Sequence, residues 1–127
     1  MIKKQTKKRK KFKKSEGISS LEVRFSQILN KLDIKFIHHF FYKNKEYDFF
    51  LPDYNYFIET HGCFFHCCPK HFPLPKYKLQ INNKKNDQTK LRNLKFSQEY
   101  NLMIIWECEM KDELLVEEKI KKRLLIN

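Results

Sequence analysis

The chain has 127 residues, with 27 Lys or Arg against 15 Asp or Glu, so its formal net charge is +12. This length predicts one domain, and a hydrophobic content of 41% is enough for a small core. No apolar run approaches the roughly 20 residues that a membrane helix needs, and two glycines are too few for a Gly-rich phosphate loop.

The charge is concentrated at the start of the chain. Residues 3–14 contain nine Lys or Arg, among them Lys8, Arg9 and Lys10, and no acid, which leaves about +3 for the remainder. Such a block repels itself until a polyanion neutralises it, and nucleic acid is the polyanion that we expect. A solubilising tail or a localisation signal is the alternative. We therefore predict a disordered basic tail at 1–17 and a folded domain at 18–127.

A helix and three strands are predicted after the tail. Ser19-Ser20-Leu21-Glu22 matches a capping box, a Ser followed three residues later by Glu, and apolar residues then repeat at helical spacing to about Leu32. Segments 35–42, 46–51 and 54–60 are rich in aromatic and β-branched residues, with a turn at 53–55. They predict three successive strands.

The second half of the chain is predicted to hold a loop, two helices and a strand. Cys, His and Pro fill residues 63–75, which we expect to be irregular; a Lys- and Asn-rich helix follows at about 77–100. Residues 102–106 are wholly apolar, as is typical of a buried central strand. A last helix is predicted at 111–125, with Leu115, Val116, Ile120 and Leu124 facing inward. The order αβββαβα predicts an α/β fold, a mixed sheet flanked by helices.

The four cysteines are grouped with two histidines. Cys63, Cys67, Cys68, His66 and His71 lie in the loop, and Cys108 follows the last strand. In an intracellular chain this grouping favours a metal over disulfides. Zinc binds four thiolate or imidazole ligands, and the set that we predict is Cys63, Cys68, His71 and Cys108. Cys67 or His66 could replace one member, and buried free cysteines that pack as small apolar side chains are the alternative.

Carboxylates and histidines form a second group. Asp48 lies in an otherwise apolar strand, and Glu59 ends the next strand eleven residues later. Two carboxylates at adjacent strand ends can bind Mg²⁺, which polarises a phosphate and lowers the pKa of an attacking water. His61 follows Glu59 by two residues and so shares its face of the strand, while Glu22 and His66 are further candidates. Each carboxylate taken alone also has a purely structural interpretation. Glu22 would then cap its helix, Asp48 would begin a turn, and Glu59 would lie on a solvent-exposed strand edge.

Three strings of the sequence carry a family resemblance. Asp48, Thr60-His61-Gly62-Cys63-Phe64-Phe65-His66 and Trp106-Glu107-Cys108 resemble the very short patch repair (Vsr) endonucleases of the PD-(D/E)XK nuclease superfamily. The resemblance covers about residues 19–110 and implies a restriction-endonuclease-like αβββαβ core, catalytic Mg²⁺ and structural Zn²⁺.

The resemblance also implies roles for individual residues. Asp48 and the main-chain carbonyl of Thr60 would bind Mg²⁺, and His66 would be a general base or acid near the attacking water. His61 would stand where most of the superfamily has Lys. Residues expected to support the site are Glu22 on the first helix and Asn83 and Asp87 on the long helix.

The sequence departs from the family at two places. The family has an apolar residue where this chain has Glu59, from which we infer a second carboxylate ligand for the metal. The family's zinc ligands in the loop are Cys, His and Cys, whereas the matching places here are Cys63, Cys68 and either His71 or a shifted partner.

The resemblance finally implies a substrate. Vsr-like enzymes nick beside a T:G mismatch and insert aromatic side chains into the opened base stack, at a cost that a mismatch reduces. Phe64 and Phe65 stand where that wedge would be, and Tyr77 is a third aromatic candidate. The alternative is that both Phe pack in the core beside the zinc.

We therefore predict a Mg²⁺-dependent DNA endonuclease that acts as a monomer on double-stranded DNA and nicks next to a T:G mismatch in DNA repair. A Vsr-like homing or restriction-type endonuclease that cuts a defined site is the first alternative. A non-catalytic, zinc-stabilised DNA-binding module is the second. We expect no membrane or small-molecule partner, and a location in the cytoplasm, at the nucleoid or in a nucleus.

Overall fold

The computed structural model describes residues 19–126, so the basic tail with Lys8, Arg9 and Lys10 lies outside the described residues. The predicted order of helices and strands is confirmed, with two short helical segments added. The elements are α2 (Ser20–Lys31), β1 (Ile37–Tyr42), β2 (Lys45–Leu51), β3 (Tyr56–His61), α3 (Cys63–His66), α4 (Lys78–Lys95), β4 (Asn101–Trp106), η3 (Glu109–Lys111) and α5 (Glu113–Leu124).

The four strands form one mixed sheet in the order β1-β2-β3-β4. β1 pairs with β2 and β2 with β3 in antiparallel fashion, whereas β3 and β4 are parallel. A parallel pair needs a long crossover, and α3 and α4 provide it. Because β3 and β4 run together, His61 lies beside Trp106 at their carboxyl ends. The segments that follow these two residues therefore begin at the same edge of the sheet.

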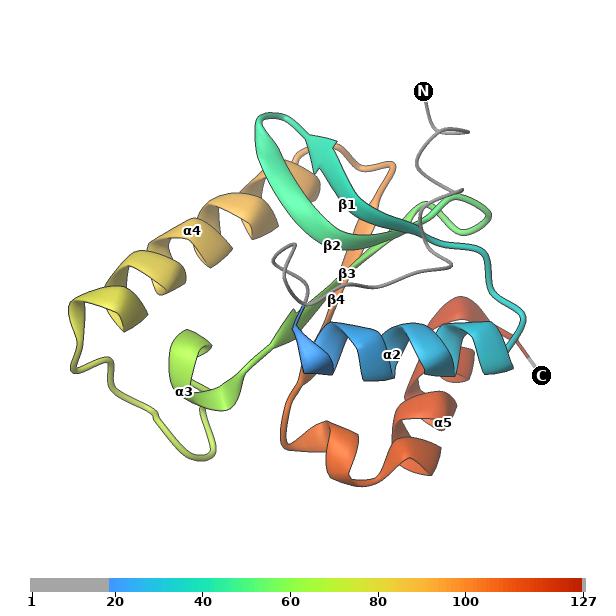
Figure 1. The fold of residues 1–127 in the computed structure, drawn as a ribbon. Coiled ribbons are helices and arrows are strands. Elements are labelled where there is room, and N and C mark those ends of the chain that lie inside the picture. The colour runs from blue at the N-terminus through green and yellow to red at the C-terminus, as the bar shows by residue number, and fades with distance from the viewer. Residues whose placement is uncertain (1–18, 127) are drawn as a thin grey trace.

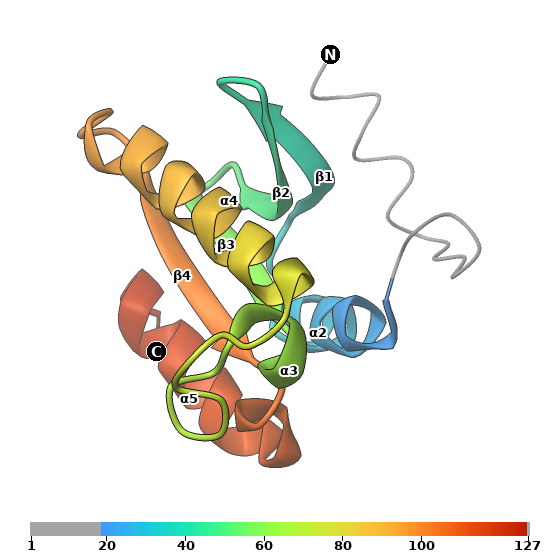
Figure 2. The ribbon, with the colours of Figure 1, turned by 90° about the vertical axis from the view of Figure 1, so that its left-hand side faces the viewer.

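Helices cover both faces of the sheet. α2 and α5 lie together on one face and α4 lies across the other (Figure 1, Figure 2). Each face has its own buried cluster: Phe25, Phe49, Ile58, Met103, Ile105 and Ile120 belong to the first, and Ile37, Tyr47, Phe50, Phe57 and Leu94 to the second. This double burial explains the runs of successive apolar residues in the strands, such as Phe49-Phe50-Leu51 in β2 and Leu102-Met103-Ile104-Ile105 in β4. None of the helices within residues 19–126 combines the length and apolarity needed to cross a membrane.

Several predicted boundaries are wrong. The 63–75 segment, expected to be irregular, begins with the short helix α3. The long helix stops at Lys95 rather than near 100, because the Ser97 hydroxyl accepts hydrogen bonds from the N–H groups of Glu99 and Tyr100 and holds a turn there. The last helix begins after Asp112, whose side chain caps Leu115 N.

Leu115 is not inward-facing. Its exposed fraction is 60%, whereas Val116, Ile120 and Leu124, spaced four residues apart, are buried. A spacing of four keeps these three on one face of the helix, and Leu115 lies one residue off that stripe.

We expect Phe49→Ala to lower the free energy of unfolding by about 3–5 kcal/mol, because the cavity it leaves in a close-packed core cannot fully collapse. The Phe49 ring is fully buried and lies 5.3 Å from the Phe25 ring and 5.4 Å from the Phe36 ring, measured between centroids. Phe41→Ala on β1 is the control, since Phe41 is 64% exposed. Denaturant unfolding measures the free energy of unfolding of both variants. An equal loss of stability in Phe49→Ala and Phe41→Ala would contradict this placement of the core.

Candidate active site

Strands β2 and β3 separate next to Asp48. Their main-chain pairing ends at Phe49 and Ile58. Just beyond it, Asp48 N donates to Glu59 Oε2 at 2.8 Å, and Thr60 N donates to Asp48 Oδ2 at 2.8 Å. A buried N–H needs an acceptor, and here two carboxylates take the place of main-chain carbonyls. The break in the ladder therefore fixes the positions of both acidic side chains.

A cleft of about 510 Å³ lies over this break. It brings together side chains from α2, β2, β3, α3 and α4 and from the segment after β4. Its polar lining includes Glu22, Asp48, Glu59, Thr60, His66, Asn83, Lys90 and Glu107. Six of these were predicted as site residues from the sequence, and Lys90 and Glu107 were not.

The electrostatics of the cleft suit a cation next to Asp48. Burial raises the pKa of Asp48 well above its usual range, and the charges of Glu59 and Glu22 raise it further. A bound cation would offset this crowding of negative charge. Among residues 19–126, the hydrogen bonds to the Asp48 side chain come from Thr60 N and Thr60 Oγ1 and both reach Oδ2. Oδ1 is thus the oxygen that can take a ligand, and the donor set fits an oxygen-seeking ion such as Mg²⁺.

Lys90 is one of the two polar cleft residues that the sequence analysis missed. Its Nζ donates to Glu59 Oε1 at 2.9 Å, and the Lys90 and Glu59 residues are 9% and 3% exposed. Burial alone would raise the pKa of Glu59, but the nearby His61 imidazole and the charge and hydrogen bond of Lys90 lower it. Lys90 is one of several lysines in α4, so its type alone gave no signal. Its spacing from Asn83 and Asp87, at i, i+4 and i+7, would have placed all three on one face.

His61, His66 and Asp87 form a compact group under the cleft. His66 Nδ1 and Asp87 Oδ2 are 2.7 Å apart, and the His66 ring stacks on the His61 ring with centroids 4.0 Å apart. His61 Nε2 lies 3.5 Å from Glu59 Oε1, which agrees with the predicted shared face of the strand. Within the described part of the chain, both His61 ring nitrogens and Asp87 Oδ1 are buried without a hydrogen-bond partner. Such atoms are rare, and beside a cleft they mark a place for water, an ion or a substrate oxygen.

Glu22 is placed by α2 but does not complete a capping box. Ser19 Oγ accepts from Glu22 N at 3.1 Å, as predicted. The Glu22 carboxylate instead hydrogen-bonds to His38 and His39 of β1. Burial acts to raise the pKa of Glu22, yet these two hydrogen bonds lower it below its usual value. The reciprocal half of the predicted cap is therefore wrong, because the carboxylate has nearer imidazole partners.

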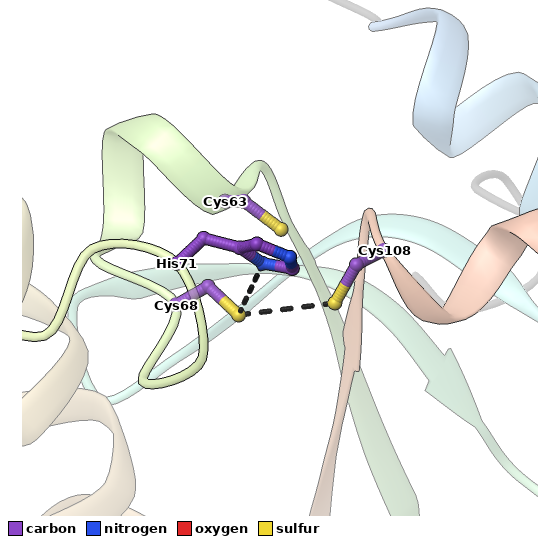
Figure 3. Close-up of side chains that lie close together, drawn as sticks. All are labelled: Cys63, Cys68, His71 and Cys108. Atoms are coloured by element: carbon purple, nitrogen blue, oxygen red, sulfur yellow. Dashed lines mark hydrogen bonds between the residues drawn. The ribbon is translucent and has the colours of Figure 1, made fainter.

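The predicted zinc ligands meet in one place. Figure 3 shows Cys63, Cys68 and His71 of the loop directed toward Cys108 after β4. Cys68 Sγ lies 3.8 Å from Cys108 Sγ and 3.7 Å from His71 Nδ1, and all four ligand atoms lie within 4.8 Å of one another. Tetrahedral zinc with Zn–S bonds of about 2.3 Å places two thiolates about 3.8 Å apart. The residues therefore fit a zinc ion.

The two alternative ligands lie outside this group. His66 is engaged with Asp87, and Cys67 is buried at the left-handed end of α3, with φ 58°.

The thiols of the Cys63–Cys68–His71–Cys108 group differ in acidity. Burial raises the pKa of Cys63 to about 12; it acts in the same direction on Cys68, but hydrogen bonds from His71 and from the Lys70 backbone lower the pKa of Cys68 to about 7. A thiol that ionises this readily is a good metal ligand.

The predicted wedge residues are exposed. Phe64, Phe65 and Tyr77 are 38%, 52% and 58% exposed, so none of them is a core residue. The Phe64 ring contacts the rings of Phe65, Tyr77 and also Phe72, which the sequence analysis did not select. Asn83 Nδ2 donates to Phe65 O, which ties α3 to α4. Phe65 also lines the cleft, so the aromatic surface is continuous with the carboxylates.

No protein-family model and no curated protein matches the chain. Among solved structures, the chain is similar to the catalytic domain of the homing endonuclease I-Bth0305I, with a TM-score of 0.56 and 24% identity over 83% of this chain and 93% of that one. At this identity the likeness concerns the fold. The mixed sheet flanked by helices is thus the fold of a known nuclease catalytic domain.

We expect Lys90→Met to lower the free energy of unfolding by about 3–5 kcal/mol, because Glu59 would stay buried without its cation. Lys84→Met on the exposed side of the same helix is the matched control. Adding Glu59→Gln to Lys90→Met should recover part of the loss, since no uncompensated charge then remains. Denaturant unfolding of the wild type, Lys90→Met, Glu59→Gln and the double variant gives the coupling free energy, and additive losses would show that Lys90 and Glu59 do not act as a pair.

Proposed function

We propose that this chain is a metal-dependent DNA endonuclease that hydrolyses a phosphodiester bond. The observation that carries the proposal is that Asp48, Glu59 and His66 line one cleft, with His66 held by Asp87. A carboxylate-lined metal site beside a general base is what phosphodiester hydrolysis requires. A solved structure with a similar fold is the catalytic domain of a homing endonuclease, which supports the same reaction class.

The ligands that we propose for Mg²⁺ are Asp48, the main-chain carbonyl of Thr60 and Glu59. Glu59 already accepts hydrogen bonds from Asp48 N and Lys90 Nζ, but a carboxylate has about four acceptor positions and retains capacity for an ion. When bound there, the ion supplies polarisation of the phosphate and a lowered pKa for the attacking water.

His66 is the proposed general base. Its Nδ1 is held by Asp87 at 2.7 Å, which fixes the ring and its tautomer and leaves Nε2 to take a proton from water. The water oxygen then bonds to phosphorus as the bond to the 3′ oxygen breaks, and the 3′ oxygen takes a proton from solvent, which leaves a 3′-hydroxyl and a 5′-phosphate. His61, stacked on His66, and Lys90 lie where a phosphate oxygen could be stabilised, and Glu22 supports the site from α2.

DNA is the proposed substrate on the grounds of charge and exposed aromatic surface. The chain carries +12, and each neutralised phosphate releases counterions, which makes binding favourable and dependent on salt. Phe65 is exposed at the cleft, and the exposed rings of Phe64 and Tyr77 continue from it, since the Phe64 ring contacts both. These rings suit contact with unstacked bases, and Asn83 and the tail residues Lys8, Arg9 and Lys10 would add polar contacts. A nick beside a T:G mismatch is the specific form that we propose, as in the Vsr enzymes.

A defined duplex site is the second candidate. The observation that favours it is the similarity in fold to a homing endonuclease catalytic domain. Such enzymes cut matched DNA, so the product distinguishes the two candidates.

We propose zinc as a structural ion held by Cys63, Cys68, His71 and Cys108. It would join the segment after β3 to the segment after β4, two parts of the chain about 40 residues apart. This fixes α3, and with it His66 and the aromatic residues, at the edge of the sheet.

With Mg²⁺ present, we expect the protein to nick a labelled duplex that carries one T:G mismatch. Asp48→Asn should slow this cleavage by at least about 10²-fold, because it removes a charge from the metal site. The amide oxygen still accepts from Thr60 N, so the fold and DNA binding should persist. Asp53→Asn, at an exposed carboxylate in a turn, is the matched control and should cleave as the wild type does. Gel electrophoresis of the products measures the rate and counts the cut strands.

The choice of duplex separates the candidates. A cut confined to the mismatched duplex supports the repair form of the proposal, whereas cleavage of a matched duplex at a defined sequence supports the homing or restriction form. Binding without metal-dependent cleavage of either duplex, or of a genomic fragment library, would contradict the endonuclease proposal and favour a DNA-binding module.

We expect Cys68→Ser to lose one equivalent of zinc relative to the wild type and to unfold at a lower temperature, because a structural site needs all four ligands. Cys67→Ser is the matched control, since the neighbouring thiol lies outside the ligand group. Elemental analysis and thermal unfolding measure the two effects. Equal zinc contents in the two variants would show that this group does not bind the ion.

A further inference from the structure

A second group of potential metal ligands lies where α2 meets β1. His38 Nε2 is 2.9 Å and His39 Nε2 is 3.0 Å from the same oxygen, Glu22 Oε1. The three ligand atoms all lie within 4.8 Å of one another. The side chains of His38 and Glu22 are 6% and 11% exposed, and that of His39 is 28% exposed. The group is therefore sheltered but can be reached from solvent through His39.

The backbone of β1 is distorted to build this group. Successive residues of a strand point to opposite faces, yet the His38 and His39 rings are 4.1 Å apart and converge on one oxygen. The cause is His39 itself, whose φ of 57° lies in the left-handed region. The other non-glycine residues with positive φ in the described chain lie in turns, in loops or at helix ends, whereas His39 lies inside a strand.

Such a conformation is costly. A non-glycine residue in the left-handed region costs of order 1–3 kcal/mol, and strain of this kind is concentrated at functional sites. An ion pair with Glu22 would need only one imidazole. The strained backbone at His39 brings a second imidazole to the same carboxylate. An ion pair does not require this second imidazole, whereas a metal site does.

The group borders the cleft. His38 pairs with Phe49 and Phe40 pairs with Tyr47, so His39 stands across from Asp48 at the position between these two pairs. Glu22 itself lines the cleft with Asp48. The distortion of β1 and the separation of β2 from β3 thus occur at the same level of the sheet.

We propose that Glu22, His38 and His39 bind a transition-metal ion such as Zn²⁺. Imidazole nitrogens prefer such ions, whereas Mg²⁺ prefers a set made only of oxygens. Two imidazoles and one carboxylate also leave coordination positions open for water or another ligand. The site is separate from the Cys63–Cys68–His71–Cys108 group and from the ligands proposed for Mg²⁺. Metal binding here does not depend on DNA cleavage, so the two proposals can fail independently.

The test is the zinc content of the full chain and its variants after dialysis against buffered Zn²⁺. His39→Asn should contain one equivalent less than the wild type, because it removes one ligand; Asn also tolerates a positive φ. Cys68→Ser should likewise lose one equivalent, and the double variant should lose about two, since the sites share no ligand. Glu46→Gln is the matched control: Glu46 Oε2 lies 3.6 Å from His39 Nδ1, but it is not a ligand, and the full content should remain.

A second measurement needs no variant. Titration of the wild type with Zn²⁺ should shift the ring resonances of both His38 and His39 in NMR spectra, because Nε2 of each ring binds the ion. Equal zinc contents in His39→Asn and the wild type, or ring resonances of His38 and His39 that do not respond to Zn²⁺, would overturn the proposal. In that case Glu22 and the two histidines serve only as a hydrogen-bonded group.

Discussion

The separation of β2 from β3 at Asp48 is the feature on which the rest of the site depends. Main-chain pairing stops at Phe49 and Ile58, and the N–H groups of Asp48 and Thr60 are then satisfied by the carboxylates of Glu59 and Asp48. Because an unsatisfied buried N–H costs about 1–3 kcal/mol, these acidic side chains cannot turn away without a loss of stability. Their hydrogen bonds thus hold the carboxylates in place, whether or not an ion is bound.

Carboxylates held this close need cations or hydrogen-bond donors around them. Lys90 meets Glu59 from α4, and the histidines of β1 meet Glu22 from the other side. Asp48 has no such cation within hydrogen-bonding distance among residues 19–126, and the pKa of its carboxyl is raised well above its usual range by burial and by Glu59 and Glu22. Glu59 and Glu22 therefore each have a basic side chain as a partner, whereas Asp48 has none in the described part of the chain. We propose that the catalytic ion binds at Asp48.

The parallel pairing of β3 with β4 connects this site to the cysteine group. It places the ends of both strands side by side, so Cys63 and Cys108 come within reach of one ion although 45 residues separate them. The proposed zinc ion would fix α3 there at its first residue, and the side chains of Gln80 and Asn83 donate hydrogen bonds from α4 to the carbonyls of Phe64 and Phe65. His66 and the exposed aromatic residues take their positions from this short helix. The proposed general base and the proposed DNA contacts thus depend on the same small segment.

Local patterns in the sequence determined the order of helices and strands, the grouping of the cysteines and the candidates Asp48, Glu59, His61 and His66, because apolar periodicity and ligand spacing are properties of short segments. Leu115, the end of α4 and the short helix α3 were mispredicted, since caps and turn hydrogen bonds decide them. The tertiary structure alone decided the partners. Lys90 was one lysine among several until the packing of α4 brought it to Glu59. The sequence offered Glu22 both as a site residue and as part of a capping box, and it gave no sign of the two imidazoles that β1 brings to its carboxylate. Hydrogen bonds between residues far apart in the chain leave no local pattern, because only the packing of the elements brings them together.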